Sequence, residues 1–339
     1  MTLARRGFLK ASLAGGLFTG CRREHEPPPE LPAEWESDDG SAVDSEGSQS
    51  PVVSASLPPD QLQPLSRGPT DVTFLVISDL HFGAVVSGQP LRPVLLNAIR
   101  EMNAIEGKAY PRAIGGKVGA VRGVLAAGDL TEDGRPPEWA EFLETMGLRG
   151  EGALRYPVFE SYGNHDEYAG NVVRAGVVER HGEAHYALTW DGLRVYCLGD
   201  GADDSRRAWL ERDLDALPKD TNIVLYQHFP MRGAWSTGQW FGDGNHRNQL
   251  RRVLEQRNVR GIFHGHNHET GHYRWGGHDT YLAGSPKHSW RNFLVVHITD
   301  ERTTVAAYHY ERKSWWWWHD KRVGREAPPY FPKGVFARA

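Results

Sequence analysis

The sequence predicts a protein of the α/β (or α+β) class. Several runs are apolar and rich in β-formers, as buried strands are, for example residues 72–79 and 122–129. Segments with helical spacing lie between them, such as residues 136–147, which begin with two prolines and end at a glycine. The apolar runs end abruptly in Asp, Asn or His, the side chains that gather outside the carboxyl ends of strands in ligand-binding α/β sheets.

Length and composition limit the classes of function. The chain has 339 residues, of which 39% are hydrophobic, enough for the core of one large domain. The formal net charge of −4 gives no overall basis for nucleic-acid binding, and none is expected. Two cysteines cannot form a disulfide framework, and Cys197, in the run LRVYCLGD, is expected to be a buried strand thiol.

Residues 1–21 have the features of an export signal rather than of a folded element. Arg5 and Arg6 precede a short apolar stretch that cannot span a bilayer, and this pattern resembles a bacterial twin-arginine signal. The segment ends in Thr19-Gly20-Cys21, which resembles the end of a lipoprotein cleavage box with Cys21 as the lipid acceptor. The alternative is an uncleaved tail with a chance arginine pair.

Residues 22–70 are rich in Pro, Ser, Asp and Glu and show no apolar periodicity, so a disordered tether is predicted there. With the signal, this segment predicts an exported bacterial protein, either periplasmic or a membrane-anchored lipoprotein. The lipid on Cys21 would anchor the protein to the membrane.

The folded domain is expected over residues 71–312. Its predicted helices are residues 93–105, 136–147, 205–217 (with Ser205 as the N-cap) and 248–257. A hairpin over residues 185–200 should turn at Asp191-Gly192. The remaining strands are predicted at residues 72–79, 122–129, 157–166, 222–230, 259–268, 279–286, 292–300 and 303–312.

Five strand ends carry metal-binding residue types. They are Asp79-x-His81, Gly128-Asp129, Gly163-Asn164-His165-Asp166, His228 and Gly265-His266-Asn267-His268. In this order, each after a strand, these motifs closely resemble those of the calcineurin-like metallophosphoesterase family, over about residues 71–310. The resemblance implies a four-layer α/β/β/α sandwich with two metal ions at the strand ends.

The resemblance also assigns ligands, by motif. One metal would be bound by Asp79, His81 and His268, and the other by Asn164, His228 and His266. Asp129 would bridge the two. Carboxylate, imidazole and amide oxygen ligands suit two divalent ions of Mn, Fe or Zn. A water shared by two such ions would be a hydroxide at neutral pH and would attack phosphorus.

His165 is the general acid that the resemblance implies, donating a proton to the leaving alkoxide. Asp166 would orient that loop catalytically or simply cap it, and the two roles are equally open. Glu132 stands where some relatives have an acid that orients the catalytic histidine. Purple acid phosphatases have a tyrosine ligand there, so an Fe(III)–tyrosinate centre is not expected. His264 lies outside the motif, as a core residue or one that orients a ligand.

The expected substrate is a small-molecule phosphodiester or phosphomonoester. The loop GDLTEDG is more similar to the small-molecule phosphodiesterase branch than to the protein phosphatases, whose GD-x-x-DRG run is absent. After His228, the Gly- and Trp-rich loop offers Arg232 as a phosphate contact. Trp235, Trp240 and His246 would either face substrate or pack on the surface.

Residues 313–339 form a Trp-rich C-terminal extension in the predicted domain division. The run Trp315–Trp318 either packs into a β-rich core or binds a membrane interface, sugars or bases. Two other functions remain open. One is a nuclease of the same fold, and the other is a non-catalytic surface-binding protein that has kept the ligand residues.

Overall fold

The computed structural model describes residues 68–231, 244–323 and 328–331. The predicted signal (1–21), with Cys21, lies outside these described residues, as do nearly all of the tether and Arg232, Trp235 and Trp240. None of the helices in the described ranges combines the length and the apolar character that a bilayer span requires.

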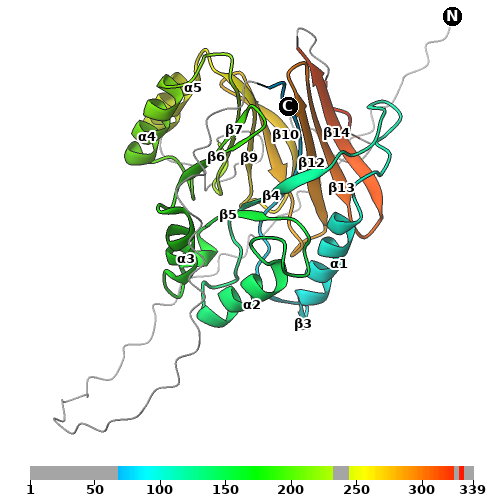
Figure 1. The fold of residues 1–339 in the computed structure, drawn as a ribbon. Coiled ribbons are helices and arrows are strands. Elements are labelled where there is room, and N and C mark those ends of the chain that lie inside the picture. Colours follow the sequence, from blue (N-terminus) through cyan, green and yellow to red (C-terminus); the bar gives the residue numbers. More distant parts are fainter. Residues whose placement is uncertain (1–67, 232–243, 324–327, 332–339) are drawn as a thin grey trace, which may run out of the picture. The chain divides into compact units, whose positions relative to one another are not determined.

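Two six-stranded mixed sheets form the centre of the fold (Figure 1). The first has the order β14-β13-β12-β1-β4-β5, with strands Ser314–Arg322, Arg302–His309, Asn292–Thr299, Asp71–Ile77, Val121–Ala127 and Val158–Ser161. The second has the order β10-β11-β9-β8-β7-β6, with strands Thr270–Trp275, His278–Ala283, Asn258–His264, Asn222–Tyr226, Leu193–Cys197 and Tyr186–Trp190. The remaining strands, Val85–Val86 (β2) and Gln89–Pro90 (β3), form a small hairpin.

Helices cover the outer faces of both sheets. They are α1 (Arg92–Asn103), α2 (Pro136–Met146), α3 (Val172–His181), α4 (Asp204–Asp215) and α5 (Gly244–Leu254). One apolar cluster joins α1 and α2 to the first sheet, and another joins α4 and α5 to the second. A third cluster lies between the sheets and contains side chains of both, such as Phe74 and Phe263. This arrangement confirms the predicted four-layer α/β/β/α sandwich.

Strand direction brings the functional loops to one edge of each sheet. In the first sheet β1, β4 and β5 run parallel, and in the second sheet β7, β8 and β9 run parallel. Parallel strands end at the same edge, so the residues that follow them gather there. Backbone hydrogen bonds join these loops, from Asp79 N to Gly128 O (3.0 Å) and from Gly265 N to His228 O (3.2 Å).

Local turn and cap chemistry was predicted correctly in one place and wrongly in another. Asp191 and Gly192 form the β6–β7 turn with φ of 40° and 82°, as a two-residue hairpin turn requires. The N-cap of α4, however, is Asp203 and not Ser205. The sequence Asp203-Asp204-Ser205 offers three capping residue types, and the Asp203 carboxylate is the one that accepts from Arg206 N (2.8 Å).

The tryptophan run forms β14, the edge strand of the first sheet. Trp317 is fully buried between the sheets, and its indole N–H donates to Thr270 Oγ1 (2.9 Å). Trp315 and Trp318 pack against the cluster on the side of α1 and α2, and Trp318 stacks on Tyr330 with ring centroids 4.0 Å apart. Trp316 packs against the cluster between the sheets and stacks on His309. Packing therefore accounts for this run, as the core alternative predicted. The division at residue 313 stays a prediction.

Trp317→Ala should lower the free energy of unfolding by about 3–5 kcal/mol, because it leaves a cavity between the sheets. Trp318→Ala is the matched control: its half-buried ring stacks on a single tyrosine, so its loss should be less than half as large. Urea denaturation of both variants measures the difference. Equal losses would contradict the placement of Trp317 in the core.

Candidate metal centre

The seven predicted ligands come together where the loops after five strands meet. They are Asp79, His81, Asp129, Asn164, His228, His266 and His268, from the loops after β1, β4, β5, β8 and β9. Their neighbours in the chain hold apolar positions in both sheets, so the sheets fix where each loop begins. The sandwich thus brings together residues that are nearly 190 positions apart in sequence.

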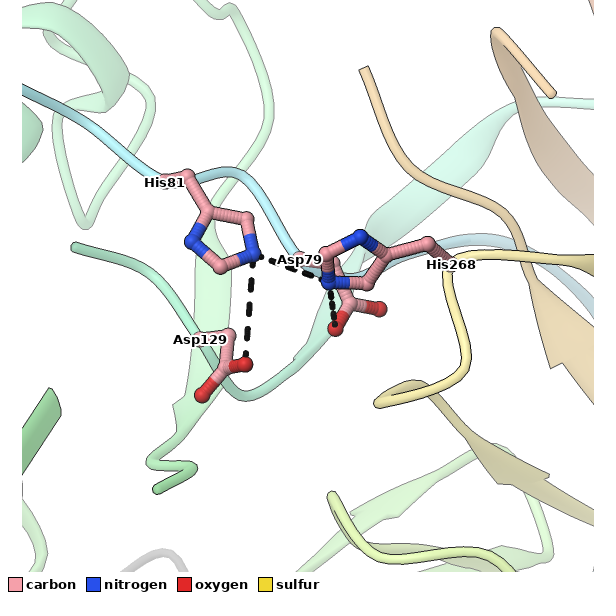
Figure 2. Close-up of side chains that lie close together, drawn as sticks. All are labelled: Asp79, His81, Asp129 and His268. Carbon is pink, nitrogen blue, oxygen red and sulfur yellow. Dashed lines mark hydrogen bonds and ion pairs between the residues drawn. The ribbon is translucent and has the colours of Figure 1, made fainter. Parts of the chain in front are cut away.

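The first donor group contains Asp79, His81, Asp129 and His268 (Figure 2). One ligand atom of each lies within 4.8 Å of the others. The Nε2 atoms of His81 and His268 are 3.0 Å apart, and His268 Nε2 is 3.4 Å from Asp79 Oδ1. His81 Nε2 is 3.9 Å from Asp129 Oδ2. Two carboxylate oxygens and two ring nitrogens therefore face one small volume.

The second donor group contains Asp129, His228 and His266, with Asn164 between them. Asn164 Oδ1 lies 3.1 Å from His228 Nε2 and 3.0 Å from His266 Nδ1. His228 Nε2 lies 3.3 Å from Asp129 Oδ1. Asp129 belongs to both groups and turns a different oxygen toward each, so its carboxylate could be shared by two cations.

A hydrogen bond on the far side of His228 and an ion-pair contact on the far side of His81 indicate the histidine tautomers. His228 Nδ1 faces the carbonyl of Ala127 (3.0 Å), and His81 Nδ1 faces Glu132 Oε2 (2.9 Å). These oxygens only accept, so each Nδ1 carries the hydrogen and each Nε2 turns a lone pair toward the donor groups. His228 Nε2 then faces the oxygens of Asn164 and Asp129, an arrangement that a bound cation or an added proton must stabilise. The donor set therefore fits divalent metal ions.

The pKa values of the buried groups also indicate a site that binds cations. Burial by itself would lower the pKa of His228, but the carboxylates of Asp129 and Asp79 raise it to about 9. Burial would likewise raise the pKa of Asp79, yet His268, His228 and His81 hold it well below its usual range. Both carboxylates are at most 1% exposed. The site is thus a buried anionic cluster that takes up positive charge.

The loops are strained at the ligand positions. Nine non-glycine residues of the described chain have positive φ, and five of them are candidate ligands: Asp79, His81, Asp129, His266 and His268. L-residues rarely adopt this conformation, and it concentrates at functional sites. Close approach adds a second constraint, because a Cβ on Gly163 would lie 2.3 Å from Asp129 Oδ1 and one on Gly265 2.5 Å from Asp79 Oδ2.

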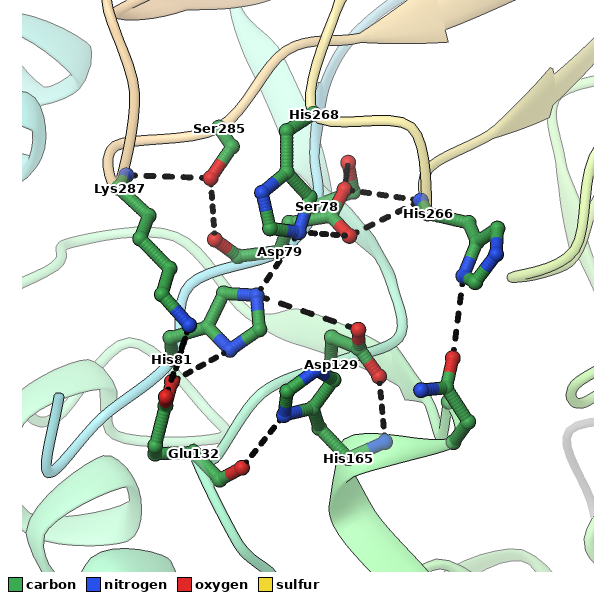
Figure 3. A network of polar contacts seen from close by, with 12 residues as sticks. Ser78, Asp79, His81, Asp129, Glu132, His165, His266, His268, Ser285 and Lys287 are labelled. Carbon is green, nitrogen blue, oxygen red and sulfur yellow. Dashed lines mark hydrogen bonds and ion pairs between the residues drawn. The ribbon is translucent and has the colours of Figure 1, made fainter. Parts of the chain in front are cut away.

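His165 lies beside the donor groups and contacts both loops around it (Figure 3). Its backbone N–H donates to Asp129 Oδ1 (2.9 Å), and its ring Nδ1 faces the Glu132 carbonyl (2.6 Å). Its ring centroid is 4.6 Å from that of His81 and 4.5 Å from that of Tyr168. This side chain is half-buried, so Nε2 can face a bound substrate.

Asp166 lies under the loop and away from solvent, with no exposed surface. Its carboxylate accepts four hydrogen bonds, from the backbone of Leu130, Thr131 and Gly163 and from the Thr131 hydroxyl, at 2.7–3.1 Å. These bonds tie the loop after β4 to the loop after β5. They favour the loop-holding alternative for Asp166 over direct participation in chemistry.

Comparison with known proteins places this geometry in a family. The family model described as calcineurin-like phosphoesterase matches residues 72–270, more than half of the chain. This chain belongs to the calcineurin-like phosphoesterase family. The family is dinuclear and metal-dependent, and the two donor groups of the chain are clustered accordingly. No curated protein matches the chain.

Solved structures share the phosphoesterase fold at low identity. GAP50, the anchor in the inner membrane complex of Plasmodium, is 14% identical, with a TM-score of 0.53, over 76% of this chain and 90% of that one. Purple acid phosphatase PPD1 from yellow lupin is 11% identical, with a TM-score of 0.53, over 73% of this chain and 53% of that one. PhoD is 11% identical, with a TM-score of 0.50, over 80% of this chain and 74% of that one. These likenesses show the fold alone.

Two other predicted residues contribute no donor atom to the phosphoesterase centre. His264 is fully buried, its Nε2 lies 2.9 Å from the Tyr273 hydroxyl, and burial lowers its pKa to about 3, so it is a neutral core residue. His246 lies on α5, where Nε2 is 3.5 Å from an oxygen of Asp204 on α4.

Sequence reasoning missed three contacts made by the segment after β11. Ser285 Oγ donates to the Asp79 carbonyl (2.8 Å), the Lys287 backbone N–H donates to Ser285 Oγ (3.1 Å), and the Lys287 ammonium binds Glu132. The stretch Gly284-Ser285-Pro286-Lys287 does lie at the end of a predicted strand, as the five ligand motifs do. It contains no metal-binding residue type, so the strand-end pattern does not single it out.

Metal binding should strengthen as pH rises. Below pH 9 the metal-free protein carries a proton on His228, which a cation must displace. The apparent affinity for Mn(II) should therefore rise by up to about tenfold per pH unit between pH 6 and 8, with about one proton released. Calorimetry in two buffers of different ionisation enthalpy counts the released protons. A pH-independent affinity would contradict this protonation state.

Proposed function

We propose that the chain is a dinuclear-metal phosphoesterase that hydrolyses small phosphodiesters or phosphomonoesters. The observation that carries this proposal is the bridging arrangement, in which Asp129 turns Oδ2 toward His81 and Oδ1 toward His228. One ion would be held by Asp79, His81, His268 and Asp129, and the other by Asn164, His228, His266 and Asp129. Two divalent ions would supply the Lewis acidity that activates water and offsets negative charge on the phosphoryl group.

His165 is the general acid of the proposed reaction. Its Nδ1–H is held by the Glu132 carbonyl, so the ring cannot rotate freely and Nε2 is left to face the leaving group. In its protonated form His165 would donate the Nε2 proton to the departing alkoxide as the P–O bond breaks. The hydrogen bond from its backbone N–H to Asp129 Oδ1 also keeps the bridging carboxylate in place.

Cellular location enters the proposal from sequence alone. Arg5-Arg6 and the following apolar stretch support export, and Cys21 supports a lipid anchor with residues 22–70 as the tether. The substrate would then be an ester outside the cytoplasm. The loop GDLTEDG supports a small molecule as that substrate.

Non-catalytic binding is the competing function, because GAP50 has this fold and is an anchor. Fold alone does not separate the two functions. The donor atoms do favour catalysis, since a binding protein has no need of seven ligand side chains, five of them in a strained backbone conformation.

Purified protein loaded with Mn(II) should hydrolyse bis-p-nitrophenyl phosphate or p-nitrophenyl phosphate. Asp129→Asn should lose at least one of the two ions and reduce turnover by at least about 100-fold, because it removes the charge shared by both groups. His264→Ala is the control and should keep both ions, which elemental analysis counts. Two bound ions without turnover of any ester would refute the enzymatic proposal.

His165→Ala should retain both ions and lower kcat by roughly 10²–10⁴-fold. The loss should be larger for alkyl leaving groups than for p-nitrophenolate, which needs little protonation. Steady-state kinetics on a methyl and a p-nitrophenyl diester provide this comparison. Metal loss in the variant, or equal effects on both esters, would contradict the general-acid role.

A further inference from the structure

We propose that Glu132 and Lys287 form a positioning pair that holds the His81 ring and keeps its Nε2 turned toward the first donor group. The inference rests on the proposed function in one respect, since it takes His81 to be a metal ligand. It assigns a function to Lys287, which lies beyond residues 72–270 that the family model matches.

The contacts form a short chain that leads away from the donor group (Figure 3). Glu132 Oε2 lies 2.9 Å from His81 Nδ1, on the side of the ring opposite the donor group. The Lys287 ammonium binds both oxygens of the same carboxylate, at 2.8 and 2.7 Å. His81 is fully buried, whereas Glu132 and Lys287 have side-chain exposures of 27% and 20%. The pair therefore lies between the buried ligand and solvent.

His81 needs such a partner more than His228 does. The ring of His228 is held by a backbone carbonyl, which cannot move independently of β4. The partner of His81 Nδ1 is instead the side chain of Glu132, whose carboxylate can rotate away on its flexible stem. Without an acceptor at Nδ1, the other tautomer would place a hydrogen on Nε2 and block the lone pair that a cation needs.

Lys287 also prevents a competing arrangement. Ligand atoms of Glu132, His81 and His165 lie within 4.8 Å of one another, close enough to hold a cation in the wrong place. A cation bound there would take up a ring nitrogen of His165, the proposed general acid. Because Lys287 binds both carboxylate oxygens, it supplies the positive charge itself and keeps Glu132 directed at His81.

The segment after β11 supports the loop after β1 at two points. Ser285 Oγ binds the Asp79 carbonyl, and Lys287 reaches His81 through Glu132. Lys287 is itself placed by the bond from its backbone N–H to Ser285 Oγ (3.1 Å). Asp79 and His81, both in strained conformations, are thus held from the same segment.

The test compares Glu132→Gln, Lys287→Met and Lys287→Arg in the full chain. Calorimetry of metal-free protein with Mn(II) measures affinity at each of two sites, and kinetics at saturating Mn(II) measure kcat and KM. Glu132→Gln should weaken one site by about 10–100-fold and leave the other within about threefold. Lys287→Met should lower the Mn(II) affinity of the same site by a smaller factor. Lys287→Arg, which keeps the positive charge, should have nearly the wild-type affinity there.

A matched control lies elsewhere in the chain. Lys313 Nζ binds Glu101 Oε1 (3.2 Å), a lysine–carboxylate pair that belongs to none of the potential metal-ligand groups found in the described residues. Lys313→Met should leave both Mn(II) affinities unchanged. If Lys287 acts through Glu132, adding Lys287→Met to Glu132→Gln should weaken the site no further.

Wild-type affinity at both sites in Glu132→Gln or Lys287→Met would overturn the proposal. A raised KM in Lys287→Met with unchanged metal affinity would also overturn it, because Lys287 would then contact substrate directly. The affinity measurements need no turnover. If the wild-type protein binds two ions but hydrolyses no ester, the proposed function fails while the positioning pair is still tested.

Discussion

Burial of two carboxylates where the sheets meet is the constraint on which the rest of the centre depends. Asp79 and Asp129 have almost no exposed surface, and an ionised group in such a position is unstable unless it is paired and hydrogen-bonded. Backbone N–H groups supply part of what is needed, from His266 to Asp79 and from His165 to Asp129. The histidines supply the rest, with a proton on His228 when no metal is bound.

This constraint explains features that look unrelated in the chain. Positive φ at the ligand positions turns the loops sharply enough for side chains from both sheets to face one volume. Glycines at positions 163 and 265 let backbone lie against the carboxylates, where any Cβ would collide. Asp166 ties two loops together from below, so the strain is held by hydrogen bonds as well as by the sheets.

The centre also separates ligands from the groups that position them. His81 and His228 each bind the surrounding protein through Nδ1 and face the donor groups through Nε2. His165 follows the same pattern, with Nδ1 on the Glu132 carbonyl. Glu132 thus contacts two histidines: its backbone carbonyl binds His165, and its carboxylate binds His81. Some relatives have an orienting acid at this position, and here its carboxylate binds His81 rather than His165.

Sequence by itself predicted most of the elements in order and, through the family resemblance, the layered fold and the candidate ligand positions; it did not predict α3, β10 or the β2–β3 hairpin. Strand periodicity, the Asp191-Gly192 turn and the polar residues at strand ends are local properties, and each motif carries its chemistry with it. The cap at Asp203 is a local choice among three neighbouring capping residues. Tertiary structure alone decided the packing of Trp317 and the contacts of Lys287 with Glu132. Both depend on partners distant in the sequence, since Lys287 and Glu132 are 155 positions apart. No local pattern contains that information, because it arises only when the two sheets pack together.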